Sequence, residues 1–267
     1  VKIAIDNYTK RGADVMIPKH KAKQVAGFGV ESIEYHLGGS FRGTFYTLND
    51  NIINGRIRGV AGVVGCNNAR TRHNEDHLLI VKELIKNDVL VLTTGCTAIA
   101  CAMDGLLAPE TAAAAAGPGL AEVCETVGIP PVLHLGSCVD NSRILLAATE
   151  VVKAGGLGND LSDLPVAGSA PEWMSEKAIS IGQYFVTSGV YTVFGYMLPT
   201  SGAPVFHDYM SKELENIYGG MWDVEADPIK HAHMMIAHID KKRKELGIDR
   251  ARERVLMDMA DRQALQA

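Results

Sequence analysis

The sequence lacks the features that mark membrane and nucleic-acid-binding proteins. No apolar run approaches the roughly 20 residues that a membrane-spanning helix needs. The longest are stretches such as VLVL at 89–92 and the alanine run at 112–116. The 26 Lys and Arg residues are outnumbered by 31 Asp and Glu, and the net charge of -5 leaves no basic excess to bind a phosphate backbone. We therefore expect no transmembrane segment and no nucleic-acid partner.

Cysteine is scarce, and its pattern does not suggest disulfides. The five cysteines form neither an even set nor a CxxC pair, which argues against the disulfide framework of a secreted protein. No signal peptide is visible, and we expect a cytoplasmic protein. The chain opens on VKIAIDNYTK without an initiator Met, which suggests a portion of a longer protein.

Short apolar runs alternate with longer amphipathic segments. The apolar runs are rich in Val, Leu and Ile and bounded by Gly or Pro, as buried parallel strands are; they lie at 60–65, 88–94, 131–135, 164–168 and 190–195. Helical spacing of apolar residues marks the segments 74–87, 108–127, 139–154 and 174–188. The alternation predicts an α/β fold with a doubly wound, mostly parallel, Rossmann-like sheet and flanking helices.

The two ends of the chain are expected to form different structures. Residues 1–55 are less regular and are expected to be the tail of a preceding α/β domain, with residues 56–267 forming a C-terminal α/β domain. The last forty or so residues are expected to form two surface helices.

Three cysteines each follow a predicted strand. Cys66 ends VAGVVGC, Cys96 ends VLVLTTGC and Cys138 ends HLGSC. Adjacent parallel strands would bring these thiols together, and the backbone N–H groups at a helix start favour the thiolate form that soft metals bind. The alternative is that each is a small apolar core residue. Cys101 and Cys124 lie inside helical patterns and are assigned to packing.

Other polar residues give weaker signals. GVAGVVG at 59–65 is not GxGxxG, so nicotinamide binding has little support. The histidines on the predicted helices, His73 and His77 early and His231, His233 and His238 late, are interpreted as solvated helix faces rather than metal ligands. Lys177 lies on the first turns of the helix predicted after the strand at 164–168. It is either a surface lysine or a cation facing the thiols, where it would stabilise developing negative charge.

Several segments together resemble a known family. GVVGCNN, KELIKNDVLVLTTGC, HLGSCVDNSRI, DLPVAGSAPEWMSEKA and the late DPIKHA and HIDKKRKELG are similar to the C-terminal part of the anaerobic nickel-iron carbon monoxide dehydrogenases, within the prismane/hybrid-cluster superfamily. The resemblance extends over nearly the whole chain but covers less than half of a family member.

The resemblance implies a site. In that family a Ni-Fe-S cluster, the C-cluster, would be held here by Cys66, Cys96 and Cys138, with nickel on Cys138. Lys177 would hydrogen-bond the carboxylate formed from CO, and Ile181 would form an apolar wall beside nickel.

The resemblance also implies a reaction. An oxidoreductase would convert CO and water reversibly to CO2, two protons and two electrons. The electrons would leave through further 4Fe-4S clusters, bound by an absent N-terminal region, to a ferredoxin-like acceptor. The full-length protein would be a homodimer, and an isolated fragment is expected to be inactive.

Two alternatives stay open. The chain could come from a hybrid-cluster protein, a hydroxylamine reductase-like redox enzyme, although the GSCVDNSRI segment around Cys138 favours the carbon monoxide enzymes. It could also be a non-catalytic fragment whose thiols face separate parts of the core. Nickel content distinguishes the first alternative, and the placement of the thiols distinguishes the second.

Overall fold

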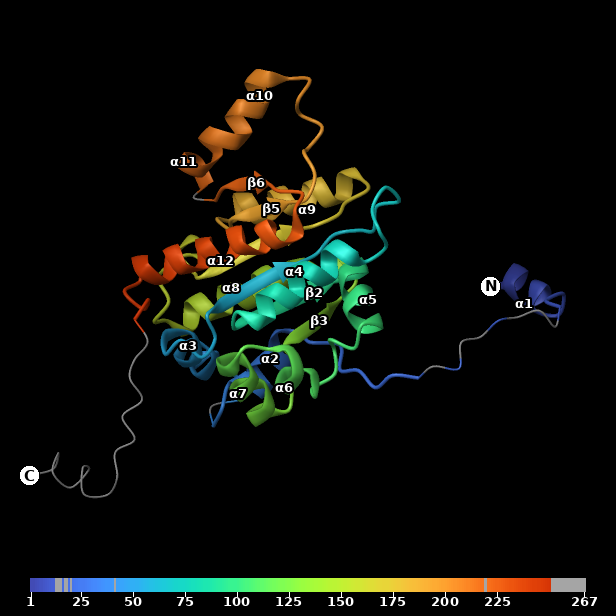
Figure 1. The fold of residues 1–267 in the computed structure, drawn as a ribbon, viewed down its shortest axis with the longest axis horizontal. Helices are drawn as coiled ribbons and strands as arrows, with labels where there is room; N and C mark the ends of the chain where they lie inside the picture. The colour runs from blue at the N-terminus through green and yellow to red at the C-terminus, as the bar shows by residue number, and fades with distance from the viewer. Residues whose placement is uncertain (13–15, 17–18, 20, 41, 219, 251–267) are drawn as a thin grey trace, which may run out of the picture.

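The fold is built on one parallel sheet. The computed structural model describes residues 1–250 except 13–15, 17, 18, 20, 41 and 219. In this part of the chain six strands pair in the order β3-β2-β1-β4-β5-β6, and every pair is parallel (Figure 1). The strands are β1 (Gly59–Val63), β2 (Val89–Thr94), β3 (Val132–Gly136), β4 (Val166–Ala170), β5 (Thr192–Phe194) and β6 (Trp222–Val224). The predicted doubly wound α/β fold is confirmed.

The strand order determines where a ligand can bind. From β1 the chain adds strands in one direction to β3, and it then returns to place β4 on the other side of β1. Doubly wound sheets bind ligands beyond the carboxyl ends of the strands at such a reversal. Strand β2, VLVLTT, lies between β3 and β1 and is buried at every residue, which explains the apolar run VLVL.

Helices cover both faces of the sheet. The helices of the described residues are α1 (Lys2–Tyr8), α2 (Val30–Leu37), α3 (Tyr46–Ile53), α4 (Glu75–Lys86), α5 (Gly95–Met103), α6 (Thr111–Ala115), α7 (Pro118–Val127), α8 (Ser142–Ala154), α9 (Glu176–Thr187), α10 (Pro204–Asp208), α11 (Leu214–Tyr218) and α12 (Pro228–Glu245). Short 3-10 turns are η1 (Cys138–Asp140) and η2 (Leu161–Asp163), and η3 (Tyr209–Glu213) is a π-helix. The helix predicted at 108–127 is divided in two, because Pro118 begins a new helix.

The ends of the chain are arranged unequally. Helix α1 buries no residue, and it lies apart from the sheet (Figure 1). Helices α2 and α3 pack into the main core through Ile33, Leu48 and Ile52, while the division of the chain after residue 55 stays a prediction. Of the two late helices that were predicted, α12 is present, and residues 251–267 lie outside the described part of the chain. Among the described residues no helix has the length and apolar character to cross a membrane.

Adding a methyl group is expected to have different effects on packing at two glycines of β1. A Cβ on Gly59 would lie 2.4 Å from the Pro165 carbonyl oxygen and 2.6 Å from Ile239 Cγ2, whereas a Cβ on Gly62 would meet Ile144 and Phe185 at 3.5 Å. Gly62 also lines an apolar cavity of about 50 Å³ between the sheet and α8.

We therefore expect Gly59→Ala to lower the free energy of unfolding by about 2–3 kcal/mol through overpacking. Gly62→Ala should change it by less than about 1 kcal/mol, because its methyl group meets only ordinary van der Waals contacts beside the cavity, and the loss of chain entropy in the unfolded state acts in its favour. Urea unfolding of both variants checks the contrast, and equal losses would contradict it.

Candidate functional site

The three predicted cysteines lie at one edge of the sheet. Cys66 follows β1, Cys96 is the second residue of α5 directly after β2, and Cys138 begins η1 after β3. A Cβ on Gly95, beside Cys96, would lie only 3.2 Å from Cys138 Cβ, so the ends of β2 and β3 are in close contact. All three cysteines are half-buried and free, and they are not dispersed through the core.

The other two cysteines differ, as expected. Cys101 in α5 and Cys124 in α7 are both buried, and desolvation raises the pKa of each thiol to about 12. Such thiols remain protonated and are poor metal ligands. They therefore serve as controls for the thiols at the sheet edge.

A small pocket joins two of the cysteines to the predicted lysine and isoleucine. Its lining includes Cys66 and Cys138 together with Lys177 and Ile181, which lie one helical turn apart on α9. The Lys177 ammonium donates a hydrogen bond to Cys138 Sγ at 3.3 Å. This bond is the main cause of the raised pKa of Lys177, and the charges of Cys138, Cys66 and Cys96 add to it. Cys96 does not line the pocket.

The turn that carries Cys138 is held firmly. The Ser137 side chain accepts a hydrogen bond from the Val139 N–H at 3.3 Å, and the Asp140 carboxylate accepts one from the Ser137 N–H at 2.8 Å. Gly136 has φ +142, and a Cβ there would overlap Asp140, so this close approach requires glycine. The local sequence therefore sets the position of the Cys138 thiol.

His134 has a modest role in the same region. On β3, its Nδ1 accepts the Gly136 N–H at 3.1 Å, so the ring supports the strand end.

The donor set is suited to a multinuclear centre. Within the described residues no three His, Cys, Asp or Glu side chains come close enough together to hold a single metal ion. Three half-buried thiols at one edge of the sheet nevertheless supply the soft sulfur ligands that iron-sulfur centres require. The assignment of each thiol to a particular metal stays a prediction.

Sequence reasoning missed a buried acid and misplaced a histidine. Glu172, two residues after β4, is 0% exposed. His77 on α4 is also 0% exposed, so the interpretation of this residue as part of a solvated helix face was wrong. The spacing of His77 with Ile80, Val81 and Leu84 places it on the apolar stripe of its helix and could have revealed this.

The late histidines are also divided between core and surface. His231 is fully buried, with Nε2 2.7 Å from Ser169 Oγ, which again contradicts the prediction of a solvated face. Burial lowers its pKa to about 4. His233 is exposed as predicted and pairs with Glu83 at 3.1 Å. Neither histidine lies in the pocket described above.

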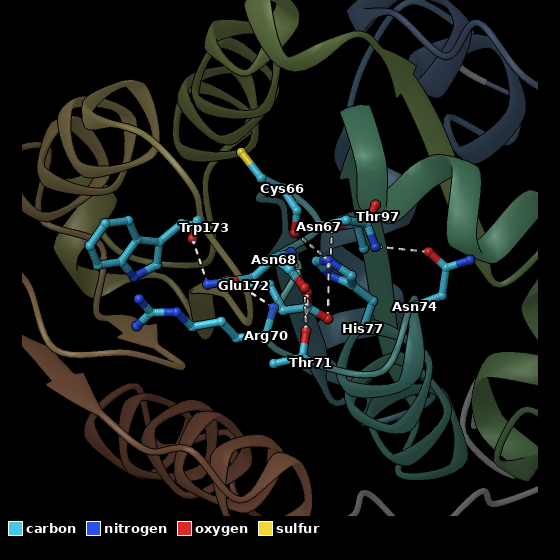
Figure 2. Close-up of polar contacts among 10 residues, drawn as sticks. All are labelled: Cys66, Asn67, Asn68, Arg70, Thr71, Asn74, His77, Thr97, Glu172 and Trp173. Atoms are coloured by element: carbon cyan, nitrogen blue, oxygen red, sulfur yellow. Dashed lines mark hydrogen bonds and ion pairs between the residues drawn. The ribbon is translucent and has the colours of Figure 1, made fainter.

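The missed pair contacts Cys66 directly (Figure 2). The Cys66 N–H donates to the Glu172 carbonyl at 2.9 Å, and His77 Nε2 lies 2.8 Å from the Cys66 carbonyl oxygen. Burial is the largest influence on His77 and lowers its pKa. Because a carbonyl oxygen can only accept, the His77 Nε2–H is the donor to Cys66.

Comparison with known proteins gives a consistent result. Residues 1–229 match the Prismane/CO dehydrogenase family. Carbon monoxide dehydrogenase 1 of Methanosarcina mazei is 52% identical over 250 residues, which cover 93% of this chain and 39% of that protein. Carbon monoxide dehydrogenase 1 of Carboxydothermus hydrogenoformans is 40% identical over 258 residues, covering 93% and 40%.

A solved structure agrees with these relatives. The nickel-free crystal structure of carbon monoxide dehydrogenase from Thermococcus sp. AM4 matches with a TM-score of 0.84 at 51% identity, covering 92% of this chain and 38% of that one. The chain spans about two fifths of the length of the curated relatives it matches. From the extent of the family match and these identities, the chain belongs to the Prismane/CO dehydrogenase family.

Proposed function

We propose that this chain is the C-terminal part of a carbon monoxide dehydrogenase, an oxidoreductase that catalyses CO + H2O to CO2 + 2 H+ + 2 electrons reversibly. The observation that carries the proposal is the Lys177 ammonium 3.3 Å from Cys138 Sγ, in a pocket that also contains Cys66 and Ile181. A cation, soft ligands and an apolar wall at one site suit an apolar substrate that becomes anionic during reaction.

The cofactor that suits this donor set is a Ni-Fe-S cluster. Cys66 and Cys96 would hold irons and Cys138 nickel. When bound, such a cluster supplies a soft metal for CO and a reservoir for the electrons that are released. The thiols of this chain would act only as its ligands, and the pocket beside them would receive the substrate.

Lys177 and Ile181 would act on the substrate side of the pocket. The ammonium, charged at neutral pH as lysines ordinarily are, would donate a hydrogen bond to the carboxylate oxygen that develops from CO. The Ile181 side chain presents an apolar surface that keeps competing water from the site.

The remaining parts belong to the portion of the relatives that this chain does not match. We assign to that portion the other cluster ligands, further 4Fe-4S clusters and the contacts of a homodimer. A ferredoxin-like electron acceptor, a cytoplasmic location and an anaerobic setting complete the proposal. The chain alone therefore carries an incomplete site.

The test compares the chain alone with a protein that also contains the missing portion. Each is reconstituted anaerobically with iron, sulfide and nickel, and CO-dependent reduction of methyl viologen is measured together with metal content. We expect turnover and bound nickel only in the longer protein. Turnover by the isolated chain would contradict the proposed incompleteness. Iron without nickel, together with hydroxylamine reduction in the longer protein, would support a hybrid-cluster enzyme instead.

A further inference from the structure

The loop that carries Cys66 is fixed by contacts from outside it. We define the Cys66 loop as residues 64–74, between the end of β1 and the start of α4. It contains no helix or strand. Asn67 Nδ2 donates to Asn74 Oδ1 at 2.9 Å and the Thr71 hydroxyl donates to the Asn68 carbonyl at 2.9 Å within the loop, and further contacts come from other segments. Glu172, after β4, and His77, on α4, provide the contacts (Figure 2).

The backbone of Cys66 is bonded on both sides. Its N–H donates to the Glu172 carbonyl at 2.9 Å, and its carbonyl accepts from His77 Nε2 at 2.8 Å. Just before it, Gly65 has φ +129, and a Cβ there would lie 2.4 Å from the Glu172 carbonyl oxygen. Only glycine allows this approach without strain, so the direction of the Cys66 side chain is set by its neighbours.

His77 also links the Cys66 loop to the segment of a second cysteine. The Thr97 hydroxyl lies 3.0 Å from His77 Nδ1, and Thr97 directly follows Cys96 on α5. With Nε2–H donating to Cys66, Nδ1 accepts the hydroxyl proton, so one neutral tautomer satisfies both bonds. The ring therefore relates the position of Cys66 to that of Cys96.

The Glu172 side chain holds the rest of the loop. Its Oε2 accepts hydrogen bonds from the Asn68 N–H and the Thr71 hydroxyl, both at 2.7 Å. Its Oε1 has no hydrogen-bond partner among the described residues and lies 4.0 Å from His77 Nε2. Glu172 is 0% exposed, and burying its side chain costs free energy that its hydrogen bonds must offset. Its bonds hold the turn after Cys66, a segment without regular structure.

We propose that Glu172 and His77 are positioning residues that set Cys66 relative to Cys96 before a cluster is bound. The fixed loop follows from the contacts alone, while its role toward a cluster rests on the proposed function. Loss of either side chain frees the loop and lets the Cys66 thiol move. A mobile thiol binds a cluster less well, since loss of the groups that support a metal ligand commonly lowers metal affinity about 10–100-fold.

The test separates the loop from the cluster. Glu172→Ala removes the carboxylate, and His77→Phe keeps a ring while removing both of its hydrogen bonds. Amide hydrogen exchange of residues 64–74 in the metal-free full-length protein should be at least about tenfold faster in both variants. Glu172→Gln retains one acceptor oxygen and should remain within about threefold of the unmodified protein, which constitutes rescue by a conservative change.

Asn49→Ala is the matched control. It removes a buried hydrogen bond to the Val151 carbonyl at 2.9 Å and a partly buried one to the Gly155 carbonyl at 2.8 Å, and neither involves the Cys66 loop. It should leave exchange of residues 64–74 unchanged, so that general destabilisation is separated from release of the loop.

Iron and nickel content and the electron paramagnetic resonance spectrum are then measured on the reconstituted full-length proteins. We expect at least about a tenfold loss of metal in Glu172→Ala and His77→Phe, with an altered spectrum of the residual cluster. Unchanged hydrogen exchange in these variants would contradict the inference that Glu172 and His77 fix the loop. Faster exchange with full metal content and an unchanged spectrum would overturn the positioning role. Failure of the unmodified protein to bind metal would overturn the proposed function instead, and the exchange result would still decide the loop.

Discussion

The Cys138→Ala protein is expected to retain less than about a tenth of its nickel and to lose at least about a hundredfold in CO oxidation. The substitution removes the proposed nickel ligand from the edge where three half-buried thiols lie, and it also removes the acceptor that the Lys177 ammonium contacts at 3.3 Å. Metal analysis and the viologen assay on the full-length protein measure the two losses. Nickel retained at the normal level would exclude Cys138 as its ligand.

Cys124→Ala is the matched control for this substitution. Cys124 is buried in α7, and its thiol donates to the Pro130 carbonyl at 3.8 Å. Removing one buried sulfur should lower the free energy of unfolding by about 1 kcal/mol and leave both nickel and activity intact. Loss of nickel in this variant would show that the effect of Cys138→Ala is not specific to the site.

Lys177→Met should lower kcat for CO oxidation by about 10²–10³-fold while leaving iron and nickel content unchanged. Methionine keeps much of the length of the side chain but cannot donate a hydrogen bond to a developing carboxylate. CO itself is uncharged, so its KM should change far less than kcat. Steady-state kinetics and metal analysis on the same preparation check both statements.

A second lysine supplies the comparison. Lys153, in the last turn of α8, contacts Glu150 at 2.7 Å and does not line the pocket, so Lys153→Met should retain full activity. If Lys177→Met lost its metal together with its activity, the lysine would be a structural residue of the site rather than a group that acts on substrate.

The sequence predicted five of the six strands described and the gathering of the thiols at one edge, but it missed β6. Alternating apolar runs predict parallel strands, and parallel strands place Cys66, Cys96 and Cys138 at one edge. The strand order could not be predicted, because no local pattern states that β4 pairs with β1. That pairing is what brings Glu172 to Cys66.

Burial of polar residues was the other limit. His77 repeats with Ile80 and Leu84 at helical spacing, so its burial was open to prediction from the sequence. Glu172 gives no such signal, since it lies in a connecting segment whose burial depends on contacts with residues about a hundred positions earlier. A charged residue after a strand is usually solvated, and only the tertiary structure shows this exception.

The succession of the three thiols along the chain has a consequence for biosynthesis. Cys66, Cys96 and Cys138 follow three different strands, and the ends of those strands meet only after β1, β2 and β3 have paired. A ribosome must release the chain beyond residue 138 before all three sulfurs can face a common space. Insertion of a cofactor would thus follow folding rather than guide its first steps. Once inserted, it would cross-link three strands of the sheet and slow their separation, so the loaded protein would resist unfolding longer than the empty one.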